Sequence, residues 1–365
     1  MSLRSCGLQD WHGLTFEQKV TDSRHLVPGP TDPRLKNLLT DIAGVKVGNA
    51  DDARLASGVT AVLFDRPAVA AIDVRGGGPG TREEAALRPE STVEAVDGFA
   101  LAGGSALGLD AAGGVQAWLA EQGRGYSVGS AVIPIVPGAI CFDLLNGGDK
   151  NWGRFSPYRD LGYAAAAAAS SDFALGSAGA GMGATTATLK GGLGSASAKT
   201  STGVMVAAVV AVNAVGSVTI GNGPWFWAAP FEVNGEFGGR GLPTAFDQDM
   251  LAVRLKGSPA ASAGENTTIA VVVTDATLTK AQAKRFAMIA QTGMARAIYP
   301  VHAPLDGDTV FAAATCAKTI DPLYGLTELG AVAANVLTRA IARGVFTATK
   351  LPFPGALPAW KDRFG

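Results

Sequence analysis

The chain has 365 residues, of which 47% are hydrophobic and 17% charged, and 30 Lys and Arg against 31 Asp and Glu give a formal net charge of −1. This composition excludes a mostly disordered chain, and the near-zero charge without a long Lys/Arg run argues against a nucleic-acid or polybasic membrane binder. The length suits one large domain or two ordinary ones, and the 48 Gly, which follow no collagen period, indicate many tight turns in a globular fold.

The first half of the chain is predicted to begin with an arm over residues 1–37, where Pro28, Pro30 and Pro33 stand among polar residues. Short apolar strands separated by Gly turns follow at 44–48, 59–65, 68–74 and 98–102. Helical spacing then predicts helices at 105–122 and, rich in Ala, at 159–169.

The second half is predicted to contain two further strands, at 203–213 and 216–220, and a long polar loop rich in Gly and Pro at 221–265. A strand at 267–274 precedes a helix at 279–297, whose start carries the capping-box spacing Thr279-x-x-Gln282. A strand at 309–314 and a helix at 326–343 complete the pattern. Because no linker divides it, we expect a single layered α/β or α+β domain over residues 38–365.

The cysteines and histidines argue against a disulfide framework and against a zinc site. They are few and scattered, with no CxxC or HExxH spacing: Cys6, Cys141, Cys316, His12, His25 and His302. We therefore predict no metal and no cofactor. The N-terminal region has no signal-peptide core, and the apolar run at 162–169 is too short to span a bilayer, so we expect a cytoplasmic protein with no membrane or nucleic-acid partner.

Several motifs fail on inspection. Residues 179–184 nearly match the dinucleotide pattern GxGxxA, but no acidic residue follows about twenty positions later. The segment 103–108 approaches a nucleophile elbow, yet Leu107 stands where GxSxG needs Gly, so Ser105 is interpreted as a helix N-cap.

Two features are harder to dismiss. A polar loop ends at Asn266 and a buried-looking strand begins at Thr267, although β-propensity alone also explains a Thr there. Asp306 and Asp308 stand just before another apolar strand, where a solvated turn is the simpler interpretation. N-terminal-nucleophile catalysis would join them: a Thr freed by self-cleavage carries both a hydroxyl and an α-amine of reference pKa about 7.7–8.0. Nearby carboxylates could orient both groups.

The chain resembles the self-cleaving L-aminopeptidase/D-esterase (DmpA-like) family, which includes β-peptidyl aminopeptidases and the endo-type nylon-oligomer hydrolase. The resemblance rests on an ordered series of blocks: 39–48, 73–82, 101–110, 132–137, 179–183, 190–194, 212–216, 266–269 and 306–309. It implies a four-layer αββα sandwich and autocleavage between Asn266 and Thr267. The products would be an α chain of 266 residues and a β chain of 365 − 266 = 99 residues, which stay together.

The resemblance also implies roles for individual residues. Thr267 would be the nucleophile, Asp306 and Asp308 its acidic partners, Asn213 an oxyanion-hole donor and Lys190 the active-site lysine. Substrate binding is assigned to Phe142, Gly104 and Ser105; Phe142 stands where some relatives carry a Tyr and cannot supply its hydroxyl.

We therefore predict a self-processing Thr amidohydrolase that acts on short peptides, amino-acid amides or β-amino analogues, and a homo-oligomer, with a tetramer of αβ units implied by the resemblance. Two alternatives use the same scaffold: an acyl or aminoacyl transferase, and a hydrolase of 6-aminohexanoate oligomers. A third is a binding protein that never matures.

Overall fold

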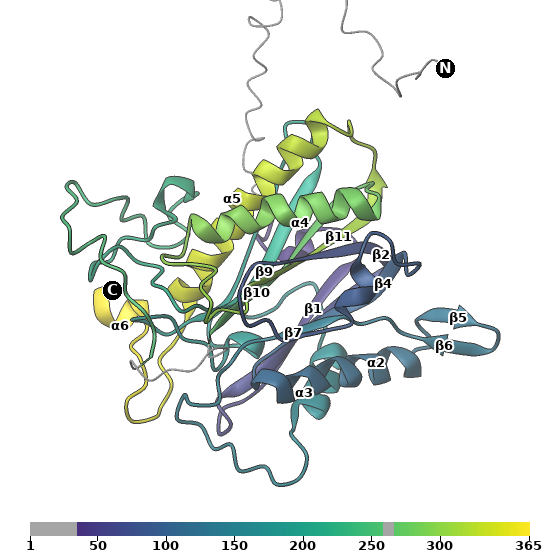
Figure 1. Ribbon diagram of the computed structural model, residues 1–365, viewed down its shortest axis with the longest axis horizontal. Helices are drawn as coiled ribbons and strands as arrows, with labels where there is room; N and C mark the ends of the chain where they lie inside the picture. The colour runs from purple at the N-terminus through teal and green to yellow at the C-terminus, as the bar shows by residue number, and fades with distance from the viewer. Residues whose placement is uncertain (1–34, 258–265) are drawn as a thin grey trace, which may run out of the picture.

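The computed structural model describes residues 35–257 and 266–365 (Figure 1). Most of the predicted arm at 1–37, and the end of the predicted loop at 221–265, lie outside the described residues. Where the loop is described, it is irregular, as predicted, apart from the short 3-10 helix Ala229–Phe231. The extent of the arm and the single-domain division stay predictions.

A nine-stranded mixed sheet occupies the centre of the molecule. Its strands are β1 (Val45–Asp52), β2 (Ser57–Val74), β3 (Thr81–Arg82), β4 (Ala95–Ala102), β7 (Gly138–Ile140), β8 (Gly192–Lys199), β9 (Met205–Asn213), β10 (Thr267–Ala276) and β11 (Thr309–Lys318). They lie in the order β3-β7-β4-β2-β11-β10-β9-β8, with β1 paired to β2. β10 is antiparallel to β9 and parallel to β11, so both of its edges are hydrogen-bonded.

The sheet folds over itself because β2 belongs to both of its halves. The β2–β4 register shifts between Leu63 and Ala68, and β2 pairs with β1 before the shift and with β11 after it. Alternate residues of β2, β9 and β10 enter one shared apolar cluster, in which Phe64, Val209 and Val271 all lie. The two halves therefore stack as two β layers with a common core between them.

Helices cover the two outer faces (Figure 1). α4 (Lys280–Ala295) and α5 (Tyr324–Thr347) pack over one face, and α2 (Ala111–Glu121) and α3 (Tyr158–Ala167) over the other, each pair enclosing its own apolar cluster. α5 is long and apolar enough to cross a membrane, but 78% of that stretch is buried in the protein, as expected of a core helix. The three clusters separate four layers, which confirms the predicted αββα fold.

Most predicted elements are present, and the differences have local causes. The predicted strands at 59–65 and 68–74 form the single strand β2. The predicted strand at 216–220 is wrong, since Ser217 and Thr219 make isolated bridges only. Ser105 is not a helix N-cap: it begins the 3-10 helix Ser105–Asp110 at φ 53°, and Gly104 precedes it at φ 83°.

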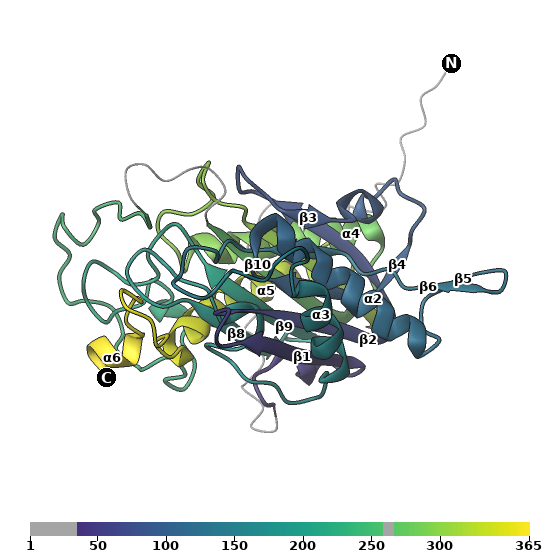
Figure 2. The same ribbon diagram turned by 90° about the horizontal axis from the view of Figure 1, so that it is seen from below.

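Five short elements were not predicted. These elements are too short to show a hydrophobic periodicity in the sequence. They are β3, β7, the hairpin β5–β6 (Tyr126–Val128 and Ala131–Ile133) and the terminal helix α6 (Trp360–Phe364). β8 is longer but consists of Gly, Ser, Ala, Leu and Lys. Its Gly194 is required because a Cβ there would lie 1.8 Å from the carbonyl oxygen of Ala340 in α5. Figure 2 shows the β5–β6 hairpin projecting from the body of the molecule.

Candidate active site

The register of the sheet brings the predicted nucleophile and its predicted partners to one place. Thr267 at the start of β10 lies opposite Asn213 at the end of β9. On the other side, the segment before β11 runs beside the segment before β10, and Asn266 forms a parallel bridge with Asp306. Residues from three separate parts of the sequence therefore meet at one end of three adjacent strands.

Thr267 is buried, and its Oγ1 donates a hydrogen bond to the carbonyl oxygen of Asn266. The same oxygen accepts a hydrogen bond from the backbone N–H of Gly307 at 2.9 Å. In the continuous chain, the Thr267 hydroxyl thus contacts the Asn266–Thr267 peptide group, the one that would be cut. The carbonyl of that group is polarised by the Gly307 N–H donor.

Gly307 has no room for a side chain. A Cβ at this position would lie 2.6 Å from Thr267 Oγ1 and 2.7 Å from the carbonyl oxygen of Gly78. Glycine is therefore needed for the loop between the two Asp residues to pack directly against the Thr267 side chain.

The two Asp side chains are buried and held by backbone donors. Asp306 accepts hydrogen bonds from Val215 N at 3.1 Å and Ala303 N at 3.0 Å. Asp308 accepts one from Thr268 N at 2.8 Å. Burial, and next the negative charge of Asp308, raise the pKa of Asp306 to about 6. Asp306 can therefore exchange a proton near neutral pH.

His302 is a site residue that the sequence analysis left among the scattered histidines. Its Nδ1 lies 2.9 Å from Asp308 Oδ2, and its backbone N–H donates to the same oxygen at 3.1 Å. It has a left-handed φ of 56°. Its place four residues before Asp306 was the sole sequence signal, and that spacing has no meaning until the loop is folded.

Asn213 is buried, and both ends of its side-chain amide are hydrogen-bonded. Its Oδ1 accepts from Thr185 N at 3.0 Å and from Lys256 Nζ at 2.9 Å, and its Nδ2 donates to the carbonyl oxygen of Phe142 at 2.9 Å. Because the amide NH2 carries two hydrogens, Nδ2 can keep its bond to the Phe142 carbonyl and still donate to an oxyanion. Lys256, which orients this amide, was not recognised from the sequence.

Lys190 is buried, and its ammonium donates to three backbone carbonyl oxygens, of Gly181, Ala184 and Gly191, at 2.8, 2.8 and 2.9 Å. These bonds cross-link the Gly-rich segments and do not reach Thr267 or the Asp pair. Burial lowers the pKa of Lys190 to about 7, so its charge is sensitive to its surroundings near neutral pH.

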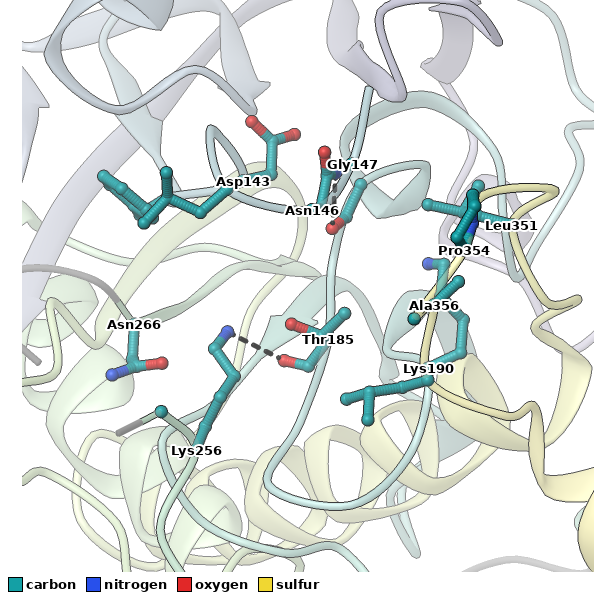
Figure 3. Close-up of a pocket in the computed structure, with 16 residues that line it drawn as sticks. Asp143, Asn146, Gly147, Thr185, Lys190, Lys256, Asn266, Leu351, Pro354 and Ala356 are labelled. Carbon is teal, nitrogen blue, oxygen red and sulfur yellow. Dashed lines mark hydrogen bonds between the residues drawn. The ribbon is translucent and has the colours of Figure 1, made fainter. Parts of the chain in front are cut away.

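A cavity of about 530 Å³ opens next to Asn266 (Figure 3). Phe142 and Lys190 line it, whereas Gly104 and Ser105 are not among its lining residues. Gly104 instead donates its N–H to the buried carboxylate of Asp143, which does line the cavity. Its described walls come from residues 142–147, 183–190, 256–257 with 266, and 351–357.

The described residues provide no ready metal site. Within residues 35–257 and 266–365, no three His, Cys, Asp or Glu side chains gather as metal ligands would. The groups that the structure places around Thr267 are its hydroxyl, two carboxylates, an imidazole and backbone N–H groups.

Comparisons with known proteins identify the family and the fold. The family model of Peptidase family S58 matches residues 37–356. An uncharacterized aminopeptidase of Mycobacterium tuberculosis is 44% identical over 349 residues, which cover 90% of this chain and 98% of the relative. A 6-aminohexanoate-oligomer endohydrolase of a Kocuria species is 30% identical over 332 residues, covering 87% and 88%.

Solved structures share the fold. A Burkholderia β-aminopeptidase superposes with a TM-score of 0.67 at 21% identity, covering 93% of this chain and 96% of that one. The L-aminopeptidase D-Ala-esterase/amidase of Ochrobactrum anthropi, described as a variant of the Ntn hydrolase fold, gives 0.67 at 19% identity, covering 92% and 93%. Together these similarities support the layered fold predicted from the sequence.

Proposed function

This chain belongs to peptidase family S58 and is a hydrolase of peptide bonds, and from that premise we propose that it cuts itself between Asn266 and Thr267 and then uses Thr267 as its nucleophile. The observation that carries the proposal is the position of the Thr267 hydroxyl on the Asn266 carbonyl, whose oxygen is held by Gly307 N–H.

Self-cleavage would begin with attack of Thr267 Oγ1 on the carbonyl carbon of Asn266. The hydroxyl proton passes to a carboxylate of the Asp306–Asp308 pair and then to the departing nitrogen, which becomes the α-amine of Thr267. An ester now joins Asn266 to Oγ1. Water hydrolyses it, leaving a carboxylate on Asn266 and restoring the hydroxyl.

In turnover, the new α-amine would take the proton from its own Oγ1, since its reference pKa of about 7.7–8.0 lies close to neutrality. Oγ1 attacks the substrate amide, the amine half of the substrate leaves with that proton, and water releases the acyl half. Gly307 N–H and the second N–H of Asn213 Nδ2 are the donors for the oxyanion.

Intact-mass spectrometry of the purified protein tests both steps. We expect two chains, of which the smaller begins at Thr267, and a Thr267→Ala variant that remains one chain and hydrolyses no amide. A Thr267→Ala variant that is still cut after Asn266 would show that another group is the nucleophile.

The substrate of this site is open to a direct comparison. The similarity to a 6-aminohexanoate-oligomer endohydrolase makes cleavage within such oligomers a second candidate activity. Aminoacyl p-nitroanilides, β-alanyl amides and 6-aminohexanoate oligomers, each assayed with and without an added amine acceptor, separate aminopeptidase, endohydrolase and acyl-transfer activity.

We also propose that αβ units associate into a homo-oligomer, with a tetramer as the expected form. The β5–β6 hairpin supports association because it presents exposed apolar side chains, among them Tyr126 and Val128, away from the body of the molecule. Sedimentation velocity measures the mass directly.

A further inference from the structure

The carbonyl of Phe142 sets the direction of the Asn213 side-chain amide. Asn213 Nδ2 donates one of its two hydrogens to this carbonyl at 2.9 Å, and Thr185 N donates to Oδ1 at the other end of the amide at 3.0 Å. The direction of the second N–H of Nδ2 then follows from these two bonds. Because Asn213 lies opposite Thr267 in the sheet, whatever holds the Phe142 carbonyl also aims this N–H.

The chain before Phe142 is fixed by backbone hydrogen bonds. Cys141 N donates to the carbonyl oxygen of Ala102, the last residue of β4, at 2.8 Å. Ser105 N donates to the carbonyl oxygen of Cys141 at 3.0 Å. These two bonds hold the peptide groups on either side of Cys141, whereas the Phe142 carbonyl belongs to the next peptide group, the one that it shares with Asp143.

Asp143 anchors that peptide group through its carboxylate, on the wall of the cavity (Figure 3). Gly104 N donates to its Oδ1 at 2.8 Å, and Ser57 Oγ donates to its Oδ2 at 2.6 Å. A Cβ on Gly103 would lie 2.1 Å from Oδ2, so the carboxylate packs directly on the backbone at this glycine. Gly104, which the sequence analysis assigned to substrate binding, thus acts on the Asp143 side chain.

The network continues into the helical layer. Tyr158 in α3 is buried, and its hydroxyl donates to Ser57 Oγ at 3.0 Å. Ser57, the first residue of β2, accepts this bond and passes its own proton to the Asp143 carboxylate as a donor. A chain of buried hydrogen bonds therefore leads from α3 through β2 to the cavity wall.

We propose that Asp143 is a positioning residue for the reaction at Thr267: it fixes the Phe142 carbonyl and thereby aims the Asn213 N–H at the oxyanion. The proposal rests on the oxyanion role proposed above for Asn213. Hydrogen bonds to a carboxylate are charge-assisted, and small displacements of a group that stabilises a transition state are costly. Asp143 can therefore affect the rate without touching the reacting atoms.

The test follows self-cleavage of freshly translated chain, a first-order reaction that needs no added substrate. We expect Asp143→Asn to slow it by about tenfold to a hundredfold, since loss of a whole oxyanion donor costs about a hundredfold to a thousandfold. The Asn amide would turn hydrogens toward Ser57 Oγ and leave the Ser57 proton without its acceptor. Tyr158→Phe removes one more distant hydroxyl and should slow cleavage less.

Asp97→Asn is the matched control. Asp97 is also buried and also holds a backbone N–H, that of Ile135, at 2.8 Å, but it is not among the residues that line the cavity. A general loss of stability from replacing a buried carboxylate should appear in both variants, whereas slower cleavage should appear only with Asp143→Asn. Thermal denaturation in the Thr267→Ala background measures the stability of each.

A double-mutant cycle with Asn213→Ala separates positioning from a purely structural role. If Asp143 acts through the Asn213 amide, Asp143→Asn should cost less than about threefold once that amide is absent. Ser57→Ala removes the donor and keeps the carboxylate, so it should show the same coupling to Asn213→Ala. It is the variant to use if Asp143→Asn does not fold.

Wild-type cleavage rates in both Asp143→Asn and Ser57→Ala would overturn the proposal. Equal slowing with and without the Asn213 amide would also overturn it, because Asp143 would then act independently of that donor, and so would an Asn213→Ala chain that matures at the wild-type rate. The wild-type mass spectrum separates these outcomes from failure of the proposed function. An uncut wild-type chain contradicts self-cleavage itself, whereas a cut chain with independent effects contradicts the role of Asp143.

Discussion

Gly307 contributes to the site through its backbone and through the side chain that it lacks. Its N–H holds the Asn266 carbonyl oxygen, and its bare Cα allows Thr267 Oγ1 to lie against the loop between the two Asp residues. The carboxylates themselves are oriented by Val215, Ala303 and Thr268 N–H groups. At the scale of single residues, the site is therefore positioned mainly by backbone donors, which substitution of neighbouring side chains cannot remove.

Gly307→Ala should slow self-cleavage by at least about a hundredfold, because a methyl group 2.6 Å from Thr267 Oγ1 must displace the hydroxyl or the donor, and loss of one oxyanion donor costs about that much. The rate is followed by gel electrophoresis of freshly translated chain, with circular dichroism to verify the fold. A folded variant that matures at the wild-type rate would contradict the role of this loop.

Self-cleavage should slow as pH falls through about 6, since the pKa of Asp306 is raised to that value and a protonated carboxyl cannot accept the Thr267 proton. Above about pH 6 the ionised carboxylate of Asp306 predominates, so the cleavage rate should level off there. Cleavage rates measured between pH 4.5 and 8 check this, and a rate that rises on acidification would exclude the pair as base.

His302→Asn should move that midpoint to higher pH, because His302 is one of the groups that lower the pKa of Asp306. Asn tolerates the left-handed backbone at this position, so the variant removes the imidazole without adding much strain. An unchanged midpoint would mean that the imidazole has no electrostatic effect on the pair.

At the scale of elements, close backbone contacts at glycines determine how helices meet. α2 packs against α3 so closely that a Cβ on Gly114 would lie 1.9 Å from the carbonyl oxygen of Arg159. Its neighbour Gly113 would meet only side-chain nitrogens, the nearest at 3.3 Å. Adjacent glycines in one helix therefore have different consequences for packing, which composition alone does not show.

Gly114→Ala should lower the free energy of unfolding by about 1–3 kcal/mol through overpacking. Gly113→Ala is the matched variant and should be neutral or stabilising by up to about 1 kcal/mol, since Ala is the better helix former. Thermal or urea denaturation of both variants in the Thr267→Ala background measures the difference; equal effects would show that the α2–α3 contact can adjust.

Elements with a long run of apolar residues or a local capping signal were predicted correctly from the sequence. Features that depend on contacts between distant parts of the chain were not. The apolar runs of β9 and β10 and the capping box at Thr279 are local signals, and all three elements are present. The predicted break between the strands at 59–65 and 68–74 is absent, because β2 continues through it. Resemblance indicated Thr267 and the Asp pair, whereas Lys256 and His302 enter the site only through folded loops.

At the scale of the whole molecule, the proposed cut falls in the middle of the fold. β10 would belong to the smaller chain, but it pairs with β9 of the larger chain from Thr267 to Thr274 and shares the core between the two β layers. In the smaller chain, α5 also packs on β8 and β9 of the larger chain, and α4 packs on β2. Neither chain can keep its core without the other.

The two chains should therefore co-elute in size exclusion and unfold in a single transition, with a melting temperature within a few degrees of that of uncut Thr267→Ala. Separation should require denaturant. If the 99-residue chain dissociates in buffer, the sheet cannot be the main contact between the two parts.

The position of Thr267 inside the sheet has a consequence for producing the enzyme. A chain end normally lies at a surface and frays, but this one would be held between β9 and β11 with its neighbour Asn266 against the cavity wall. Expressing the two halves from separate genes would place an initiator methionine where Asn266 lies, and the α-amine would be one residue out of place. Such a reconstituted enzyme should stay inactive until that methionine is removed. Cleavage of a folded single-chain precursor avoids this problem, because it creates a chain that begins at Thr267 in its buried position.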